Sequence, residues 1–336
     1  MKARQLWFVG TAEVEIREQE IGYPAADEIL VRTQYSGISA GTEMLVYRGQ
    51  LPGDIALDAS IAALKDKGNS YPLMYGYACV GRIEAVGSAV DSKIQGKLVF
   101  AFQPHVSHFI CRQEHVVLLP DDLPEEAGIF LANMETAVSL LIDAQPKANE
   151  SVAVIGLGIV GQLVNCLMQD YPVKKVIVTD RIAGRRELAT QTSGFKSFDP
   201  DAREFLDEIG EEGVELVFEL SGNPQALNLA IPICGFAGRI IVGSWYGNKT
   251  SELKLGGRFH RNRISIISSQ VSTIHPDYSA VWTREKRLKK ALESIVSLHP
   301  EQFISHRFHI TKAVDAYRTL DMEAEQVMQV IFTYED

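Results

Sequence analysis

The sequence is poor in cysteine, and its cysteines are not grouped. The four residues are widely scattered and form no C-x-x-C pair: Cys79, Cys111, Cys166 and Cys234. This spacing excludes a disulfide framework and a four-cysteine zinc lobe. It predicts reduced, buried thiols in a cytoplasmic protein.

The sequence also lacks a long apolar run and an excess of positive charge. No run approaches the roughly 18 apolar residues that a membrane span requires, and Met1 to Gln5 lack the apolar segment of a signal peptide. The formal net charge of −10 argues against a nucleic-acid surface. We therefore expect neither membrane nor nucleic acid as a partner, and a small-molecule substrate instead. A length of 336 residues predicts two domains.

A glycine-rich turn follows a short apolar run near the middle of the chain. Residues 151–155 are small or β-branched, as in a parallel strand buried on both faces, and G-x-G-x-x-G follows directly. Gly156 would permit a tight turn, Gly158 would let backbone approach a pyrophosphate, and Gly161 would let the next helix pack closely. Ile159 and Val160 would line the turn at the helix N-terminus, where N–H groups favour phosphate.

An acidic residue ends the next predicted strand, residues 173–179. Asp180 stands 19 residues after Gly161, where a carboxylate can accept hydrogen bonds from both ribose hydroxyls of NAD and would repel a 2′-phosphate. Arg181 and Arg185 lie beside it, where they can stack on adenine or admit a 2′-phosphate, so NADP use stays open. The sequence predicts an NAD site.

Strands and helices alternate through the rest of this region. Further strands are expected at 196–198, 214–220, 239–243 and 264–268, with helices at 162–170, 183–192 and 223–234. Such alternation predicts a doubly wound parallel sheet with helices on both faces. Ligands bind outside the carboxyl ends of such strands, which places Ser221, Gly243 and Ser244 at the cofactor cleft.

The first 120 residues have a different pattern. Alternating or apolar segments at 13–17, 28–33, 77–87, 97–102 and 115–119 predict short strands of a compact β-barrel, with a surface helix or loop at 53–69. The pattern of the C-terminal segment, residues 284–332, predicts a helix at 284–297 and then a strand, a helix and a strand over 303–332. We expect it to return to the β domain.

Four segments carry a resemblance to a known family: residues 31–49 (VRTQYSGISAGTEMLVYRG), 75–87 (YGYACVGRIEAVG), the glycine turn, and 218–243. In this order they resemble the medium-chain dehydrogenase/reductase superfamily. SGISAGTE and FHRNRISIISSQVS resemble its branch related to bacteriochlorophyllide hydroxyethyl dehydrogenases.

The resemblance implies an α/β protein with two domains. A discontinuous GroES-like β-barrel catalytic domain would span 1–125 and 270–336, and a Rossmann domain would span 126–269. It also implies that Ser268 lies near the nicotinamide and that the strand at 264–268 pairs with a second copy in a homodimer.

The sequence departs from the zinc-dependent members of this superfamily at their metal ligands. Ser39 or Ala40 stands where they carry cysteine, and Tyr77 stands where they carry histidine. Glu135 is the acid near the third ligand position. Two of three ligands are missing, so we predict a zinc-free enzyme. An unusual metal site drawn from Glu43, Tyr77, Glu135, His105 and His108 remains an alternative.

The family positions suggest which residues replace the metal. Tyr77, with Ser39 beside it, would donate a hydrogen bond to a carbonyl oxygen, Thr42 would relay a proton, and His105 or His108 would be an outer acid or base. Each residue also has a simpler interpretation. Tyr77 fills the volume of the metal, Thr42 caps a helix over 43–47, the histidines are solvated, and Glu135 caps a helix or pairs with an arginine.

These patterns favour an NAD-dependent alcohol or polyol dehydrogenase without catalytic zinc, which transfers hydride at the nicotinamide. One alternative is a zinc-free quinone or enoyl (C=C) reductase, a class that the resemblance associates with NADPH. A second is a non-catalytic NAD-binding protein.

Overall fold

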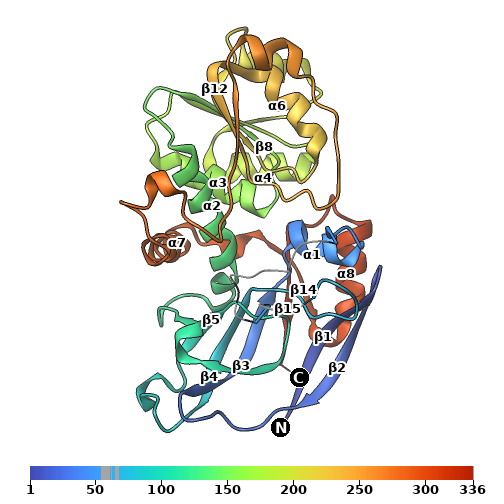
Figure 1. Ribbon diagram of the computed structural model, residues 1–336, viewed down its shortest axis with the longest axis vertical. Coiled ribbons are helices and arrows are strands. Elements are labelled where there is room, and N and C mark those ends of the chain that lie inside the picture. Colours follow the sequence, from blue (N-terminus) through green and yellow to red (C-terminus); the bar gives the residue numbers. More distant parts are fainter. Residues whose placement is uncertain (54–60, 62, 65–67, 336) are drawn as a thin grey trace. The chain divides into compact units, whose positions relative to one another are not determined.

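The computed structural model describes residues 1–53, 61, 63–64 and 68–335. Most of the loop predicted at 53–69 lies outside these residues. The chain divides into two compact units, one of residues 1–132 with 299–336 and the other of residues 133–298 (Figure 1). The sequence predicted the divisions at 125 and 269. In the structure, residues 270–298 belong to the second unit, and the chain returns to the first unit at His299.

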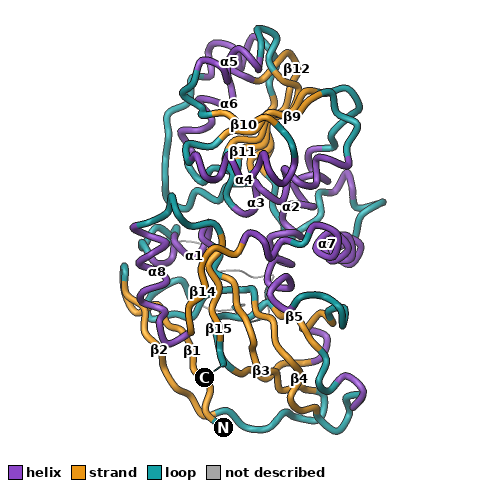
Figure 2. Tube along the Cα trace, turned by 180° about the vertical axis from the view of Figure 1, so that it is seen from behind, coloured by secondary structure: helices purple, strands orange, loops and turns teal. Residues whose placement is uncertain are grey.

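The second unit contains a six-stranded parallel sheet of order β10-β9-β8-β11-β12-β13 (Figure 2). Its strands are β8 (Ser151–Ile155), β9 (Lys175–Thr179), β10 (Lys196–Phe198), β11 (Val214–Glu219), β12 (Cys234–Val242) and β13 (Ser265–Ser268). All five residues of β8 are buried, as expected for a central strand covered on both faces. The predicted doubly wound sheet is confirmed.

Helices connect these strands. They are α2 (Leu131–Ala144), which enters the unit, α3 (Ile159–Leu167), α4 (Ala183–Ser193), α5 (Arg203–Ile209), α6 (Leu227–Ile233) and α7 (Arg284–Leu298). The helix after the glycine turn begins at Ile159, three residues before its predicted start, so Gly161 lies inside it. The short helix α5 was not predicted.

The first unit is built mainly of β-structure. A seven-stranded sheet has the order β14-β15-β3-β4-β5-β7, with β6 also paired to β3, and β1 and β2 form a separate pair. The strands are β1 (Lys2–Gly10), β2 (Glu13–Glu20), β3 (Glu28–Gly37), β4 (Cys79–Val86), β5 (Leu98–Ala101), β6 (His108–Arg112), β7 (Val116–Leu118), β14 (Ile304–His309) and β15 (Gln329–Thr333). Strands β1 and β6 were not predicted.

The tail joins this sheet as predicted. Strand β15 pairs antiparallel with β3, with Phe332 opposite Ser36. Helix α8 (Ala313–Met322) precedes β15 and packs near α1 (Ala40–Tyr47) and β2. Its Tyr317 is fully buried and packs edge-on against Phe8 with ring centroids 5.2 Å apart. The fold class, a β-rich unit with a Rossmann sheet, is therefore as the sequence predicted.

Within the described residues, one segment is long and apolar enough to cross a membrane. It spans Glu125–Ala144, and 83% of its most apolar window is buried inside the protein. A core helix passes the same test of length and composition, and this burial is that of a core helix.

Candidate active site

The turn between β8 and α3 has a geometry that only glycine fits. Gly156 has a φ of +95°, and a Cβ there would lie 2.6 Å from backbone atoms of Leu220 and Ser221. A Cβ on Gly161 would lie 2.0 Å from the carbonyl oxygen of Gly156. These contacts bring the turn close to the end of β11 and the helix close to the turn.

Gly158 is the N-cap residue of α3, and a Cβ built there would meet no described atom within 4 Å. The first N–H groups of an α-helix lack partners inside that helix. Those of Ile159 and Val160 at the start of α3 are therefore suited to a pyrophosphate.

The carboxylate of Asp180 connects the glycine turn to the segment after β9. It accepts hydrogen bonds from the backbone N–H of Leu157 at 2.7 Å and of Ile182 at 2.8 Å. Each carboxylate oxygen has a second lone pair, so it can still accept from a ribose hydroxyl. Asp180 thus stands beside the turn in the way that an NAD site requires.

The arginines near Asp180 differ in their surroundings. Arg181 is exposed, whereas Arg185 is half-buried, and burial lowers the pKa of its guanidinium while Asp180 raises it. Arg186, which was not predicted, donates to the carbonyl oxygens of Asp180 at 2.6 Å and Arg181 at 2.8 Å. It therefore holds the chain that follows β9.

A buried carboxylate lies at the carboxyl ends of β11 and β12, and the sequence interpretation missed it. Glu219 is fully buried and accepts from the Ser221 backbone N–H at 2.8 Å and from the Tyr246 hydroxyl at 2.5 Å. Burial beside this carboxylate raises the pKa of Tyr246. The Ser244 hydroxyl accepts from the Gly222 N–H at 2.9 Å, so the loops after the two strands are joined.

The remaining predicted residues of this unit lie where the topology places them. Gly243 follows β12, and a Cβ there would lie 2.6 Å from the side chain of Leu220. Ser268 is the last residue of β13 and is exposed. Its neighbour Ser269 donates to Asp143 at 2.6 Å, and burial raises the pKa of that carboxyl.

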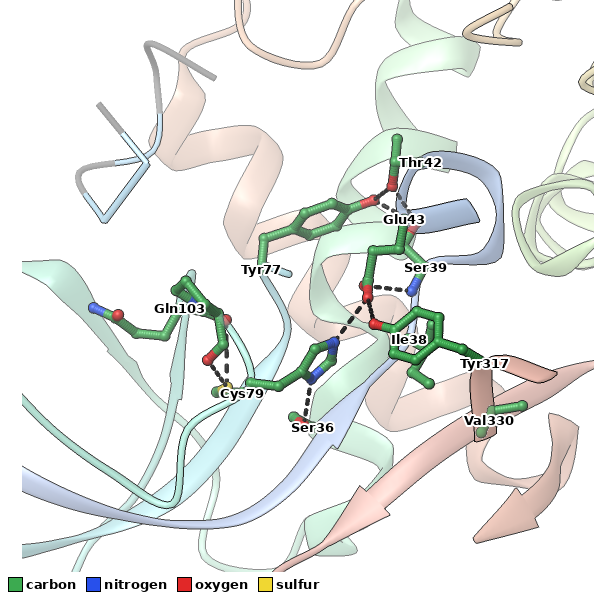
Figure 3. Close-up of polar contacts among 12 residues, drawn as sticks. Ser36, Ile38, Ser39, Thr42, Glu43, Tyr77, Cys79, Gln103, Tyr317 and Val330 are labelled. Atoms are coloured by element: carbon green, nitrogen blue, oxygen red, sulfur yellow. Dashed lines mark hydrogen bonds and ion pairs between the residues drawn. The ribbon is translucent and has the colours of Figure 1, made fainter. Parts of the chain in front are cut away.

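In the first unit, three hydroxyl groups meet where the resemblance places two zinc ligands. Thr42 Oγ1 lies 2.8 Å from both Ser39 Oγ and the Tyr77 hydroxyl, and the Tyr77 hydroxyl lies 2.5 Å from Ser39 Oγ. Figure 3 shows the phenol of Tyr77 pointing toward Thr42. The Tyr77 ring packs edge-on against Tyr75, with centroids 6.2 Å apart, which fixes its direction. We name Ser39, Thr42 and Tyr77 the hydroxyl cluster.

The local fold explains how Ser39 and Thr42 meet. Helix α1 begins at Ala40 with Ser39 as its N-cap residue, so Thr42 lies in the first turn and faces Ser39. The interpretation of Thr42 as the cap of a helix over 43–47 is wrong, because the helix begins three residues before Glu43. The Ser39 side chain does not cap the helix, which leaves its hydroxyl for the cluster.

A buried carboxylate lies next to this cluster. Glu43 is fully buried and accepts from the Ser39 backbone N–H at 2.8 Å, from the Tyr317 hydroxyl at 2.5 Å, and from His105 Nε2 at 2.8 Å. In Figure 3 the phenol of Tyr317 points toward Glu43. Burial next to this carboxylate raises the pKa of the Tyr317 hydroxyl far above its usual value.

His105 is also fully buried, so the interpretation of this residue as solvated is wrong. Its Nδ1 lies 2.7 Å from Ser36 Oγ, which lies 2.7 Å from the Tyr334 hydroxyl. Both ring nitrogens of His105 are thus engaged, by Ser36 and by Glu43. His108 is half-buried on β6, 3.8 Å from Glu84, and burial lowers the pKa of its imidazole.

Glu135 pairs with an arginine, one of the two simpler interpretations that the sequence offered. The buried guanidinium of Arg287 on α7 donates to Glu135 Oε1 on α2 at 2.8 and 3.0 Å. It also donates to the carbonyl oxygen of Thr273 at 3.2 Å. Arg287 was not predicted, because 152 residues separate it from Glu135.

These donors do not fit a catalytic zinc ion. Neutral hydroxyls occupy the positions of two ligands, and zinc prefers thiolate, imidazole and carboxylate. The positive charge of Arg287 already compensates the carboxylate of Glu135. In the part of the chain that the structure describes, no three His, Cys, Asp or Glu side chains are grouped to hold a metal ion.

Comparison with known proteins agrees with the fold. Residues 160–286 match the family model described as zinc-binding dehydrogenase. The chain is 24% identical to the starvation-sensing protein RspB of Escherichia coli, over 96% of this chain and 97% of RspB. It is 25% identical to galactitol 1-phosphate 5-dehydrogenase of E. coli, over 77% of this chain and 84% of the relative.

Solved structures cover the chain almost completely. The rspB protein of E. coli CFT073, complexed with NADH, superposes with a TM-score of 0.79 and 20% identity over 99% of both chains. The chain therefore has the fold of these dehydrogenases, and residues 160–286 carry its likeness to the zinc-binding dehydrogenase model. A butanediol dehydrogenase from Bacillus subtilis has the same fold, with a TM-score of 0.78 and 17% identity over 99% of this chain and 100% of that one.

Proposed function

We propose that the protein is a member of the medium-chain dehydrogenase/reductase superfamily, and that it is an NAD-dependent alcohol or polyol dehydrogenase that works without a catalytic zinc ion. The observation that carries the proposal is the hydroxyl cluster, which replaces two zinc ligands with groups that can donate and accept protons. The alcohol and polyol dehydrogenases among the relatives support the substrate class.

Asp180 supports NAD as the cofactor. Its carboxylate lies against the glycine turn, where it can bind ribose hydroxyls and repel a 2′-phosphate. When bound, NAD⁺ accepts the hydride that leaves the carbinol carbon of the substrate. The protein must then bind the alcohol, orient it and remove its hydroxyl proton.

The hydroxyl cluster has the groups for this proton transfer. Tyr77 would hydrogen-bond the substrate oxygen and take its proton as the phenol passes its own proton to Thr42, which releases its hydroxyl proton toward solvent, while Ser39 hydrogen-bonds both hydroxyls. Each of the three hydroxyls can both donate and accept, so a proton can move from one oxygen to the next by reorientation. This arrangement also favours catalysis over a non-catalytic NAD-binding role.

The other predicted catalytic residues bond elsewhere in the protein. His105 bonds Glu43 and Ser36, and Glu135 bonds Arg287. The proposal therefore gives these two residues no proton-transfer step. We also propose a homodimer through β13, the edge strand of its sheet, because an unpaired apolar edge favours pairing with a second copy.

Turnover measurements test the proposed function. Purified protein should form NADH from NAD⁺ with at least one secondary alcohol or polyol and should bind NADH more tightly than NADPH. NADPH-dependent reduction of an activated C=C bond, without alcohol oxidation, would identify the protein as a quinone or enoyl reductase. Tight NADH binding without turnover of either class would indicate the non-catalytic alternative.

A further inference from the structure

One buried carboxylate joins three parts of the first unit that lie far apart in the sequence. Glu43 lies on α1 and receives hydrogen bonds from the start of that helix, from the segment before β6 and from α8. The segment before β6 is in turn bonded to β3 and the C-terminal end through Ser36 and Tyr334. A single side chain therefore fixes the backbone that carries Ser39 and Thr42.

One tautomer of His105 satisfies the hydrogen bonds of Glu43, His105, Ser36 and Tyr334 together. With the His105 proton on Nε2, that nitrogen donates to Glu43 and Nδ1 accepts from Ser36, whose oxygen can in turn accept from the Tyr334 hydroxyl. With Tyr317 and the Ser39 N–H, the carboxylate then has three donors. Such bonding is what a buried charge needs to avoid a large desolvation cost.

The hydrogen bonds among the described residues let Glu43 and His105 support the hydroxyl cluster without passing a proton to it. The described hydrogen bond between the two is the backbone N–H of Ser39, and an amide N–H does not lose its proton at neutral pH. Both nitrogens of His105 are engaged within the buried group. A proton on His105 therefore has no side-chain route through these bonds to Tyr77 or Thr42.

We propose that Glu43 and His105 are positioning residues for the hydroxyl cluster, which rests on the proposed dehydrogenase function. They hold the first turn of α1 so that the Ser39 and Thr42 hydroxyls meet Tyr77 in one arrangement. Misplacement of a reacting group by about 1 Å can lower a rate about 100-fold, so loss of this support lowers kcat. Binding of NADH depends on the second unit and is unchanged.

Three substitutions separate support from proton transfer. His105→Gln keeps an N–H donor for Glu43 and an acceptor for Ser36 but cannot titrate. His105→Ala removes both bonds. Glu43→Gln keeps an acceptor for the Ser39 N–H but loses the charge and presents an N–H₂ group to His105 or Tyr317. His115→Gln is the matched control, because His115 is an exposed histidine of the same unit and has no part in the proposed chemistry or its support.

If Glu43 and His105 position the hydroxyl cluster, the kcat values of these variants should fall in a definite order. His105→Gln should retain at least about a third of kcat with the pH profile unchanged, whereas His105→Ala and Glu43→Gln should lose about 10- to 100-fold in kcat at constant NADH affinity. A low activity of His105→Gln equal to that of His105→Ala, or the loss of one limb of its pH profile, would show that His105 transfers protons. Full activity of His105→Ala would show that the group has no role.

Amide hydrogen exchange gives a readout that does not need activity. The Ser39 and Thr42 amides should exchange at least about ten times faster in His105→Ala than in the unmodified protein, and His105→Gln should restore protection. Equal protection in all variants would overturn the positioning role. If the unmodified protein shows no NAD-linked turnover, the proposed function fails, and the exchange rates still decide whether Glu43 and His105 hold the turn.

Discussion

At the residue scale, the proposed chemistry depends most on the phenolic oxygen of Tyr77. It is the largest of the three hydroxyl side chains, and its ring direction is fixed by Tyr75. The hydroxyls of Ser39 and Thr42 both lie within hydrogen-bond distance of this oxygen, at 2.5 Å and 2.8 Å.

Replacing Tyr77 with phenylalanine should lower kcat by about 100-fold or more, because general acid–base catalysis contributes about 10² to 10⁴ in rate. The Kd of NADH should change less than about threefold, because the nucleotide site is in the second unit. Steady-state kinetics and fluorescence titration measure the two quantities. Tyr35→Phe, a half-buried phenol on β3, is the control. An unchanged kcat in Tyr77→Phe would leave only the volume-filling interpretation.

Asp180 should decide the choice between the two cofactors. Asp180→Asn loses the negative charge that binds ribose hydroxyls and opposes a 2′-phosphate. A hydrogen bond to a charged group contributes about 1.5 to 3 kcal/mol, so the Kd of NADH should rise about 10- to 100-fold and the preference over NADPH should shrink. Titration with both nucleotides measures this change. An unchanged preference would show that the discrimination lies elsewhere.

Much of the proposed nucleotide site could be predicted at this scale. The G-x-G-x-x-G pattern is local, from Gly156 to Gly161, and Asp180 follows its strand directly. The support of the hydroxyl cluster could not be predicted in the same way. Tyr317 lies 274 residues from Glu43, and Tyr334 lies 298 residues from Ser36, so no local pattern connects them.

At the scale of the elements, α2 and α7 are held together by the buried pair of Glu135 and Arg287. Arg287→Met leaves Glu135 buried without its partner and should cost about 3 to 5 kcal/mol of unfolding free energy. The double variant Glu135→Leu, Arg287→Met removes both charges and should recover most of that loss. Urea titration measures all three proteins. A double variant that is no more stable than Arg287→Met would contradict the account.

A second ion pair gives a pH dependence. Arg239 on β12 bonds both oxygens of Glu150 at 2.8 Å. Burial raises the pKa of Glu150, but the hydrogen bonds from Arg239 and from the Lys147 N–H outweigh it and hold the pKa below its ordinary value of 4.5. A lowered folded-state pKa adds stability above the unfolded-state value, and this stability is lost as pH falls through the folded-state value.

The unfolding free energy of the unmodified protein should therefore exceed that of Glu150→Gln by a constant amount above about pH 5.5. The difference should shrink as pH falls below about 4.5. Urea titrations from pH 7 to pH 3 measure it. A difference that stays constant down to pH 3 would show that the pKa of Glu150 is not lowered by folding.

The sequence predicted most elements of the parallel sheet because buried central strands read as continuous apolar runs. Strand β1 was missed because its residues do not alternate cleanly, and its exposed, half-buried and buried positions are mixed. Strand β6 was missed because its first residue, His108, was interpreted together with His105 as part of a solvated loop. Both strands depend on pairing with partners that local propensity does not reveal.

At the scale of the whole molecule, two units carry the two parts of the proposed reaction. The unit of residues 133–298 has the nucleotide turn, and the unit of residues 1–132 and 299–336 has the hydroxyl cluster. The two-unit fold could be predicted from four segments of sequence that resemble the superfamily. The end of the second unit at Leu298 could not be predicted from sequence. It depends on tertiary contacts of α7, such as that of Arg287 with Glu135 on α2.

The most direct test of the account is the zinc content of active enzyme, purified without chelator and measured by elemental analysis alongside NAD-linked turnover. We predict less than about a tenth of a zinc ion per chain, and turnover that a chelator does not inhibit, because a catalytic site would hold zinc nearly stoichiometrically. About one zinc ion per chain, with activity that is lost on chelation and restored by zinc, would contradict the zinc-free mechanism.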